Sequence, residues 1–534
     1  MSGTSYDTII VGGGIAGLTS GVYLARTGQK ILLIEKNKEC GGLVNTLSHN
    51  GFYFDAGVRA LLDAGIIFPM LKDLNIHLEV VKSPVSIGIE KEIINIETVD
   101  GLIKYQEILV KLYPESKEEI DEVIKIIKKI MKHMDVLYGI ENPVFKDLKR
   151  DINFIFKKLL PWFPKFIFTI RKINQMSLPV EEYLMKIVKN PSLRDIIAQH
   201  FFRNTPAFFA LSYFSLYLDY FYPKGGMGKL SEALKNKILE YGGEIKTETK
   251  VVEVRADKKI IKDDKNISYR YENLIWAADL KTFYRITHID GLSNRIKTKF
   301  ETTKNIMLQN RGGDSVFSLF LEIDEPLESF RKIAYGHFFY TPSKIGLGET
   351  HRKELDYLLA NFEKIGKKQI LTWLEKFIKL NTYEISIPGL KDPDMCPPGK
   401  TGMIISFLAE YDLFHKIQKA GWLDEFVMEI EKRLLDVITD SVYPILKNKV
   451  ISRFSFTPLS IENRIGSSEG AITGWAFQKS MPVINKIQSA GRSVLTPIPS
   501  VYQAGQWVYS PAGVPMSILT GKLAADRIIK KMRI

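Results

Sequence analysis

The hydrophobic pattern near the start of the chain predicts a strand, a helix and a second strand in succession. Residues 8–11 form a short β-branched run, and residues 30–34 are predicted to form a second, buried strand. A helix-compatible stretch between them reaches Arg26, and Gly28 then ends it. The same reading predicts a helix to Tyr241, strands at 244–247, 251–255, 274–278 and 500–504, and an apolar helix from Met516.

The turn after the first strand carries the pattern G-x-G-x-x-G, which points to dinucleotide binding. Gly12 allows a sharp turn, Gly14 lets backbone N–H groups approach a pyrophosphate, and Gly17 lets the helix pack closely on the strand. The helix N-terminus favours an anion. Glu35 ends the second strand, 18 residues beyond Gly17, where it can accept hydrogen bonds from an adenosine ribose.

Composition and charge narrow the classes of protein. With 534 residues, 45% of them hydrophobic and 25% charged, the chain is globular and long enough for more than one domain. Its two cysteines lie 356 positions apart without a histidine cluster, so we expect no metal site and a cytoplasmic location. The net charge of +13 favours an anionic partner. Glycines in 8–25 and prolines in 493–521 argue against a membrane-spanning helix.

Glycines that follow Glu35 give a family resemblance. Gly41 and Gly42 come first, and the segment 51–57 then reads Gly-Phe-Tyr-Phe-Asp-Ala-Gly. This resembles the flavoprotein superfamily that includes phytoene desaturases, carotenoid isomerases, retinol saturases and amine oxidases. Residues 222–230 resemble the P-x-G-G-x-G-x-L turn of its carotenoid-desaturase branch, and 505–515 resemble its C-terminal flavin segment. The resemblance implies a non-covalent FAD cofactor, with Cys40 as a small side chain in a turn.

The resemblance also implies a fold and a set of cofactor contacts. The fold class is α/β, with a discontinuous Rossmann-like FAD-binding domain from 1–75, 222–300 and 490–534. Residues 76–221 and 301–489 are then an α+β substrate-binding domain with a helical, membrane-facing part. The implied FAD contacts are Gly12, Gly14, Ile15, Ala16, Gly17, Glu35, Lys36, Gly41, Gly42, Leu43, Asp55, Gly57, Val251, Val252, Ala277, Gly505, Gln506, Gly513, Val514 and Pro515.

Two positions depart from the family pattern. Residues 276–279 read Trp-Ala-Ala-Asp where the desaturase branch has Ser-Asn-Ala-Asp, so the asparagine is missing. Gln506 stands where family members commonly carry an acid, and its amide can still hydrogen-bond the ribityl chain or pyrophosphate. The helix after Pro515 is expected to direct its N-terminus at the pyrimidine end of the flavin, where reduced flavin carries negative charge.

Two segments of the substrate domain have unusual composition. Residues 201–222 contain ten aromatic side chains, which fit either a pocket wall for an apolar substrate or ordinary core packing. Residues 141–176 carry eight basic and three acidic residues among large apolar ones. This mixture fits a surface that enters an anionic bilayer, and a solvated helical face is the alternative. We expect membrane rather than nucleic acid as the partner.

Catalysis is expected to come from the flavin. The polar residues His200, Arg203, Asp219 and Asp279 lie in or beside the aromatic and flavin-proximal stretches and are candidate acids or bases. His337 is expected in the core. The favoured function is hydride transfer between the flavin and a carbon–carbon bond of an isoprenoid or carotenoid-like lipid, with oxygen or a quinone as electron acceptor. Desaturation is favoured, and isomerisation and saturation stay open. Amine oxidation and a non-catalytic lipid-surface protein are the alternatives.

Overall fold

The computed structural model describes residues 4–146, 151–198, 201–348 and 350–532. The strand–helix–strand prediction is confirmed by β1 (Ser5–Val11), α1 (Ile15–Ala25) and β2 (Ile31–Ile34). β2 and the second half of β1, residues 8–11, are buried, which explains their runs of β-branched and aliphatic residues.

The first sheet combines strands from distant parts of the chain. β2 pairs in parallel with β1 and with β10 (Glu244–Lys246), and β1 pairs in parallel with β13 (Ser268–Trp276). β20 (Val501–Gln503) adds to β13, also in parallel. The remaining strands, on the other side of β13, are β12 (Ile260–Asp263), β11 (Val251–Arg255) and β14 (Thr287–His288).

The register of these strands brings four loops together. Ile34, Val11 and Trp276 are aligned across β2, β1 and β13, and Trp276 is aligned with Gln503 of β20. The four strands therefore end at the same edge of the sheet. Because ligands bind at the carboxyl edge of parallel sheets, the segments that follow these strands are the natural place for a site.

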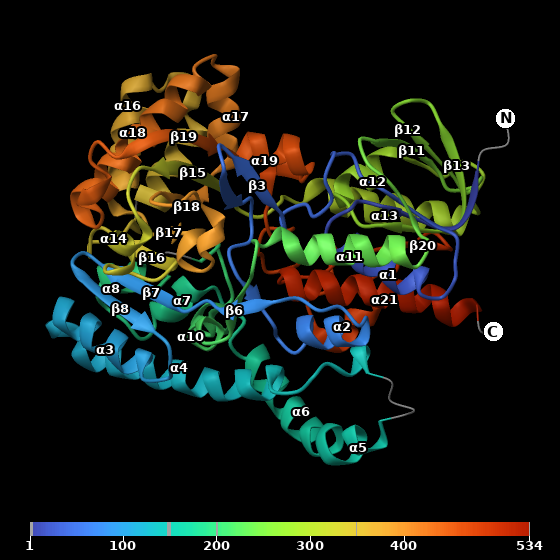
Figure 1. Ribbon diagram of the computed structural model, residues 1–534, viewed down its shortest axis with the longest axis horizontal. Helices are drawn as coiled ribbons and strands as arrows, with labels where there is room; N and C mark the ends of the chain where they lie inside the picture. The colour runs from blue at the N-terminus through green and yellow to red at the C-terminus, as the bar shows by residue number, and fades with distance from the viewer. Residues whose placement is uncertain (1–3, 147–150, 199–200, 349, 533–534) are drawn as a thin grey trace.

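Three helices pack beside this sheet. α1 contacts both α11 (Gly228–Glu240) and α21 (Val514–Met532), and the three lie next to one another in Figure 1. The contact between α1 and α21 is close, because the Ser20 hydroxyl donates a hydrogen bond of 2.9 Å to the Gly521 carbonyl. The C-terminal helix is thus part of the same packed unit as the first helix.

A second, seven-stranded sheet lies beside the first unit (Figure 1). Its order is β19 (Val450–Phe456), β15 (Ser315–Ile323), β18 (Thr401–Ala409), β17 (Tyr383–Ser386), β16 (His337–Thr341), β7 (Val85–Ile89) and β8 (Glu92–Ile96). One face packs in a large apolar core with α16 (Lys367–Leu380), α17 (Tyr411–Lys419) and α18 (Leu423–Ser441). Its other face packs in part against Phe52 and Phe54, through Phe320 and Ile404.

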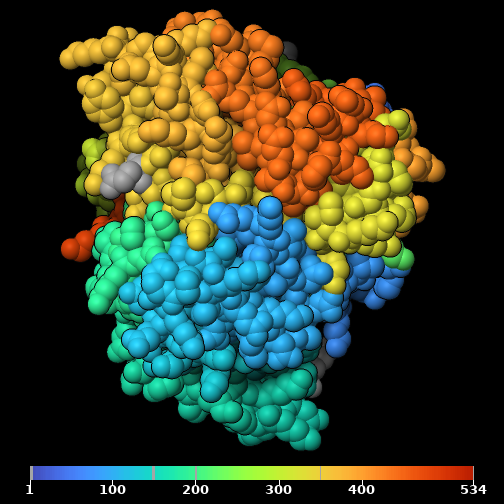
Figure 2. Space-filling model, turned by 90° about the vertical axis from the view of Figure 1, so that its left-hand side faces the viewer, coloured from blue at the N-terminus to red at the C-terminus, as the bar shows by residue number. Residues whose placement is uncertain are grey.

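A helical part lies below the second sheet in Figure 1. It includes α3 (Gly101–Leu112), α4 (Lys117–Tyr138), α8 (Pro191–Ala198), α9 (Ala207–Leu211) and α10 (Tyr213–Tyr217). The short α5 (Ile152–Phe154) and α6 (Leu160–Asn174) project away from the body below α4, and Figure 2 shows this segment in teal at the lower end. Within the described ranges, no helix is both long and apolar enough to cross a bilayer.

Candidate flavin and substrate site

A single large cavity joins the carboxyl edge of the first sheet to the second sheet. Its volume is about 1860 Å³, and its lining includes residues after β1, β2, β13 and β20 together with residues of β15, β16, β17 and β18. Pockets for one small ligand usually measure about 300–1,000 Å³, so this cavity has room for a dinucleotide and a second ligand.

Two glycines in the turn after β1 have different physical roles. An added Cβ at Gly17 would lie 1.9 Å from the Gly12 carbonyl oxygen, so Gly17 is required for α1 to approach the turn. Gly14 has open space where its Cβ would lie, and it lines the cavity with Gly12, Ile15 and Ala16. The turn therefore presents bare backbone to a ligand, as the sequence predicts for a pyrophosphate site.

The end of β2 places an acid at the cavity wall. Glu35 is only 8% exposed, and its carboxylate accepts hydrogen bonds from the backbone N–H groups of Gly13, at 2.7 Å, and Asn37, at 2.9 Å. These bonds fix the carboxylate beside the glycine turn. Lys36 also lines the cavity, and its ammonium donates to the Asn463 carbonyl at 2.9 Å.

The second glycine pair lies directly against the first turn. The Gly41 N–H donates to the Gly13 carbonyl at 2.8 Å, and Gly41, Gly42 and Leu43 all line the cavity. Gly57 lines it too, and a Cβ there would lie 2.5 Å from the Leu43 carbonyl oxygen. Cys40 is buried behind this turn, outside the cavity lining, and burial raises the pKa of its thiol to about 11.

Asp55 lies beneath the cavity rather than in its wall. Its buried carboxylate accepts hydrogen bonds from the Tyr222 hydroxyl, at 2.7 Å, and from the Met227 N–H, at 2.9 Å. Asp55 thereby ties the segment 51–57 to the turn 222–230, which leads into α11. Its geometry is that of a residue that positions the two glycine-rich turns.

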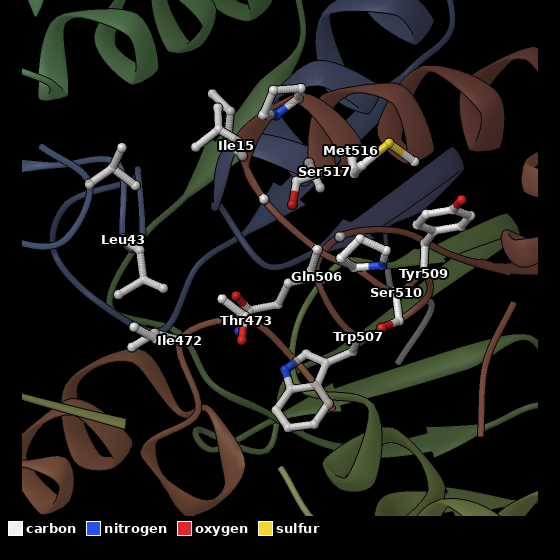
Figure 3. A pocket seen from close by; sticks show the side chains of 18 of the residues that line it. Ile15, Leu43, Ile472, Thr473, Gln506, Trp507, Tyr509, Ser510, Met516 and Ser517 are labelled. Atoms are coloured by element: carbon white, nitrogen blue, oxygen red, sulfur yellow. The ribbon is translucent and has the colours of Figure 1, made fainter. Parts of the chain in front are cut away.

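Most of the other predicted cofactor residues line the cavity, but Val252 does not. Val251 and Ala277 line it, whereas Val252 has 41% of its surface exposed to solvent and lies outside. Gly505, Gln506, Gly513, Val514 and Pro515 line it as well. The Gln506 amide donates to the Ser467 hydroxyl and the Ala471 carbonyl, both at 3.3 Å. Figure 3 shows Ile15, Leu43, Gln506 and Met516 around the same space.

The four candidate catalytic residues are not gathered in one place. Asp279 lines the cavity, but its carboxylate caps α12 (Leu280–Ile286) through Thr282 and also accepts from the Ser468 N–H. Arg203 lies outside the cavity lining and pairs with Asp356 at 3.2 Å. Asp219 also lies outside, 3.9 Å from the Lys82 ammonium. His200 lies outside the described residues.

The aromatic segment 201–222 contributes rings both to the cavity wall and to the apolar cores. Five of its ten rings line the cavity, namely Phe202, Phe208, Phe209, Tyr213 and Tyr220. Others are in the apolar cores, among them Phe201, Phe214, Tyr217 and Tyr222. The cavity thus has one broad aromatic wall, continued by Ile170, Ile173 and Leu178 near the end of α6.

His337 is buried as expected, and it also borders the cavity. His337 is 3% exposed, but it lines the cavity beside Glu384 and Arg59. Period-two alternation in β16 separates His337 and Phe339 from Phe338 and Tyr340, which pack in the core on the other face. The sequence therefore carried a signal for two faces, but none for which face borders the cavity.

Comparison with known proteins identifies the family. The sequence pattern described as flavin containing amine oxidoreductase matches residues 15–529. The chain belongs to this family. The glycine turns and the N-terminus of α21 expose backbone around one cavity, and Glu35 adds a carboxylate beside the first turn. This combination fits a flavin dinucleotide. The cofactor is FAD, and the protein is an FAD-dependent oxidoreductase.

Similar proteins include enzymes that act on polyenes. The chain is 23% identical to all-trans-retinol 13,14-reductase of Danio rerio, with 94% of this chain and 82% of that protein covered. It is 21% identical to 4,4'-diapolycopene oxygenase of Methylomonas sp., with 100% of both covered. It is also 21% identical to 1-hydroxycarotenoid 3,4-desaturase of Flavobacterium sp. (strain P99-3), with 97% and 98% covered.

Solved structures share the fold. A variant of putrescine oxidase superposes with a TM-score of 0.61 at 13% identity, with 99% of both chains covered. An oxidoreductase from Methanosarcina mazei superposes with a TM-score of 0.59 at 14% identity, with 99% of this chain and 100% of that one covered. The predicted α/β class of FAD-dependent oxidoreductases is confirmed.

Proposed function

We propose that this protein transfers hydride between FAD and a carbon–carbon bond of an apolar isoprenoid polyene. The observation that carries the proposal is the continuity of one cavity from the glycine turns to the aromatic wall formed by residues 202–220. Rings offer broad, rigid apolar surface that suits a conjugated chain. The retinol reductase and carotenoid desaturase among the similar proteins support the same substrate class.

The residues of this chain would bind and orient the two reactants. Bound FAD supplies the hydride chemistry. Gly14, Gly42 and Glu35 would hold its pyrophosphate and ribose, and the N-terminus of α21 would stabilise negative charge through free N–H groups. The aromatic wall would exclude water and align the polyene. In desaturation the substrate would lose an allylic hydride, for which bound FAD would be the acceptor, and a proton from the neighbouring carbon, which would leave to solvent or to a base.

We further propose that the substrate enters from a membrane through the segment 151–174. Its six exposed large apolar residues are Ile152, Phe156, Leu160, Phe163, Ile167 and Phe168. The last four of these belong to α6, whose Ile170 and Ile173 line the cavity. One helix would thus connect the bilayer to the substrate site.

Charge and anchoring support the membrane proposal. All three exposed phenylalanines of the described residues lie in this segment, together with the exposed Lys157, Lys158 and Lys165. Such a mixture inserts rings into the bilayer interface while ammonium groups meet lipid phosphates. The opposite face of α6 is fixed to α4, because the Trp162 indole N–H donates to the Val136 carbonyl at 2.5 Å.

Vesicle binding tests the membrane proposal. The triple variant Phe156→Ser, Phe163→Ser, Phe168→Ser should lose at least about tenfold in affinity for vesicles that contain anionic lipid, because about 0.8 kcal/mol is lost for each CH₂ group no longer buried. Flavin content should be unchanged. The exposed Tyr357→Ser, on α15 (Leu355–Ala360), is the matched control. Equal binding by the triple variant and the wild type would contradict the proposal.

Anaerobic mixing tests the reaction. If the enzyme desaturates, the oxidised flavin absorbance should bleach on addition of a partly saturated isoprenoid; if it saturates, the photoreduced flavin should reoxidise with a polyene. Putrescine is the test for amine oxidation. If the amine bleached the flavin and the isoprenoids did not, the proposed function would be wrong and amine oxidation would take its place. Oxygen and a soluble quinone, added afterwards, identify the electron acceptor by the rate at which colour returns.

A further inference from the structure

A polar row crosses the cavity face of the second sheet. Ser318 of β15 is aligned with Ser406 of β18, and Ser406 is aligned with Glu384 of β17. All three line the cavity. The adjacent positions Leu319, Ile405 and Ile385 point to the opposite face, where they are fully buried in the apolar core. The cavity therefore has an apolar aromatic wall on one side and a polar wall on another.

His337 extends this row on the next strand. Its Nε2 lies 3.0 Å from Glu384 Oε1, and its ring stacks on Tyr220, with centroids 5.4 Å apart and an interplanar angle of 20°. Burial lowers the pKa of His337, although the neighbouring Glu384 opposes that shift. Both ring nitrogens are buried, and neither has a hydrogen-bond partner among the described residues despite the short distance from Nε2 to Glu384. His337 therefore borders the cavity with unused hydrogen-bonding capacity.

Arg59 completes the group from the other side. Its guanidinium donates to the Ser406 hydroxyl at 3.3 Å and to the Ser318 hydroxyl at 3.5 Å, while its Nε is buried without a partner in the described chain. Although burial opposes ionisation, His337, Arg59 and Lys391 hold the pKa of Glu384 below its usual range. About a third of the Glu384 side chain is accessible, because it faces the cavity.

These three side chains match one kind of end group. A carboxylate accepts a hydrogen bond, and the Arg59 Nε–H donates one, so a hydroxyl can satisfy both at once. A hydrocarbon end would leave buried polar atoms unpaired, which costs binding free energy. A carboxylate end would meet the negative charge of Glu384 in a site of low dielectric constant. An alcohol is therefore favoured over both.

We propose that Arg59, His337 and Glu384 bind the hydroxyl group of an isoprenoid alcohol at the polar end of the cavity. This inference rests on the proposed function, because it specifies the substrate class of the same cavity. It assigns a specificity role to residues outside the nucleotide-binding turns, and it requires no change in the hydride chemistry.

The wild-type holoenzyme provides the first test. The enzyme is titrated with three ligands that have the same polyene chain, namely all-trans-retinol, its deoxy hydrocarbon and retinoic acid. The perturbation of the flavin spectrum reports binding. We expect retinol to bind at least about tenfold more tightly than either of the others, since a hydrogen bond to a charged group adds about that factor. Equal binding of alcohol and hydrocarbon would overturn the inference while leaving the proposed function intact. Binding of none of the three would overturn both.

A charge-removing variant provides the second test. Glu384→Gln is nearly isosteric and should weaken retinol binding about tenfold, while strengthening retinoic acid binding, because the repulsion is lost and Arg59 remains. A purely structural role would weaken all three ligands alike, and that result would also overturn the inference. The matched control is Glu322→Gln, in β15 of the same sheet, whose carboxylate contacts His49 outside the cavity lining. It should leave the three affinities unchanged.

Discussion

Gly14 and Gly17 lie three residues apart in one turn, but Gly17 is needed for folding and Gly14 for the cofactor site. Alanine at Gly17 would place a methyl group 1.9 Å from a backbone oxygen, so we expect Gly17→Ala to cost more than about 3 kcal/mol of folding free energy. Gly14→Ala meets open space and should fold normally, but its methyl group projects into the cavity and should weaken FAD binding.

Thermal unfolding and flavin absorbance per mole of protein separate the two glycine variants. The control is Gly491→Ala, in α20 (Ala490–Ser493), where the nearest atom would be 3.7 Å away. If Gly14→Ala bound FAD as tightly as the wild type, the assignment of this turn to the pyrophosphate would be wrong.

Asp314 predicts a pH-dependent contribution to stability. Burial raises the pKa of its carboxyl from 3.8 to about 6, against a hydrogen bond from the Arg203 N–H. The folded state therefore binds the proton more tightly than the unfolded state. This contribution is present in full below about pH 4 and is lost as the pH rises through about 6.

Replacement of Asp314 tests this contribution. Asparagine cannot ionise but can still accept the hydrogen bond, so Asp314→Asn should gain stability relative to the wild type as the pH rises from about 4 to 6.5. Denaturant unfolding of both proteins across this range measures the difference. Parallel stability curves would show that the carboxyl does not titrate in this window.

At the scale of elements, Trp162 decides whether α6 stays on α4. Trp162→Ala removes the hydrogen bond to the Val136 carbonyl and the stacking on Phe166, with centroids 4.4 Å apart, and should cost about 3 kcal/mol locally. We expect faster limited proteolysis within 151–174 and an unchanged flavin spectrum. The neighbouring exposed Phe163→Ala should be cleaved at the wild-type rate. Equal rates for the two variants would contradict the anchoring role.

Local signals made some elements predictable. The turn at 12–17 partly encodes its own geometry, because a Cβ at Gly17 would meet the Gly12 carbonyl oxygen five residues earlier. The predicted strands and helix around it have close to their observed bounds. The candidate site was harder to predict from the sequence. His337 and Glu384 face the cavity only because β16 and β17 pair in one register, and that pairing joins residues 43 to 49 positions apart. Asp279, predicted as a catalyst, caps a helix formed by the residues that follow it.

At the scale of the whole molecule, FAD should stabilise distant chain segments together. The cavity walls that fit the cofactor come from residues 11–17, 34–43, 249–251, 276–279 and 504–517. Removal of FAD should raise amide hydrogen exchange in all of them at once, and added FAD should raise the unfolding free energy by about 2.7 kcal/mol at a concentration of 100 times its Kd. Exchange confined to a single segment would contradict a shared site. The helices α16 and α18 serve as internal controls.

The pairing of β20 with β13 also has a consequence for biosynthesis. A ribosome makes residues 501–532 after every other wall of the cavity, and a growing chain lacks both that strand and the helix that packs on α1. FAD can therefore bind only after residues 501–532 have left the ribosomal exit tunnel. Polypeptides terminated before residue 501 should stay colourless in the cell.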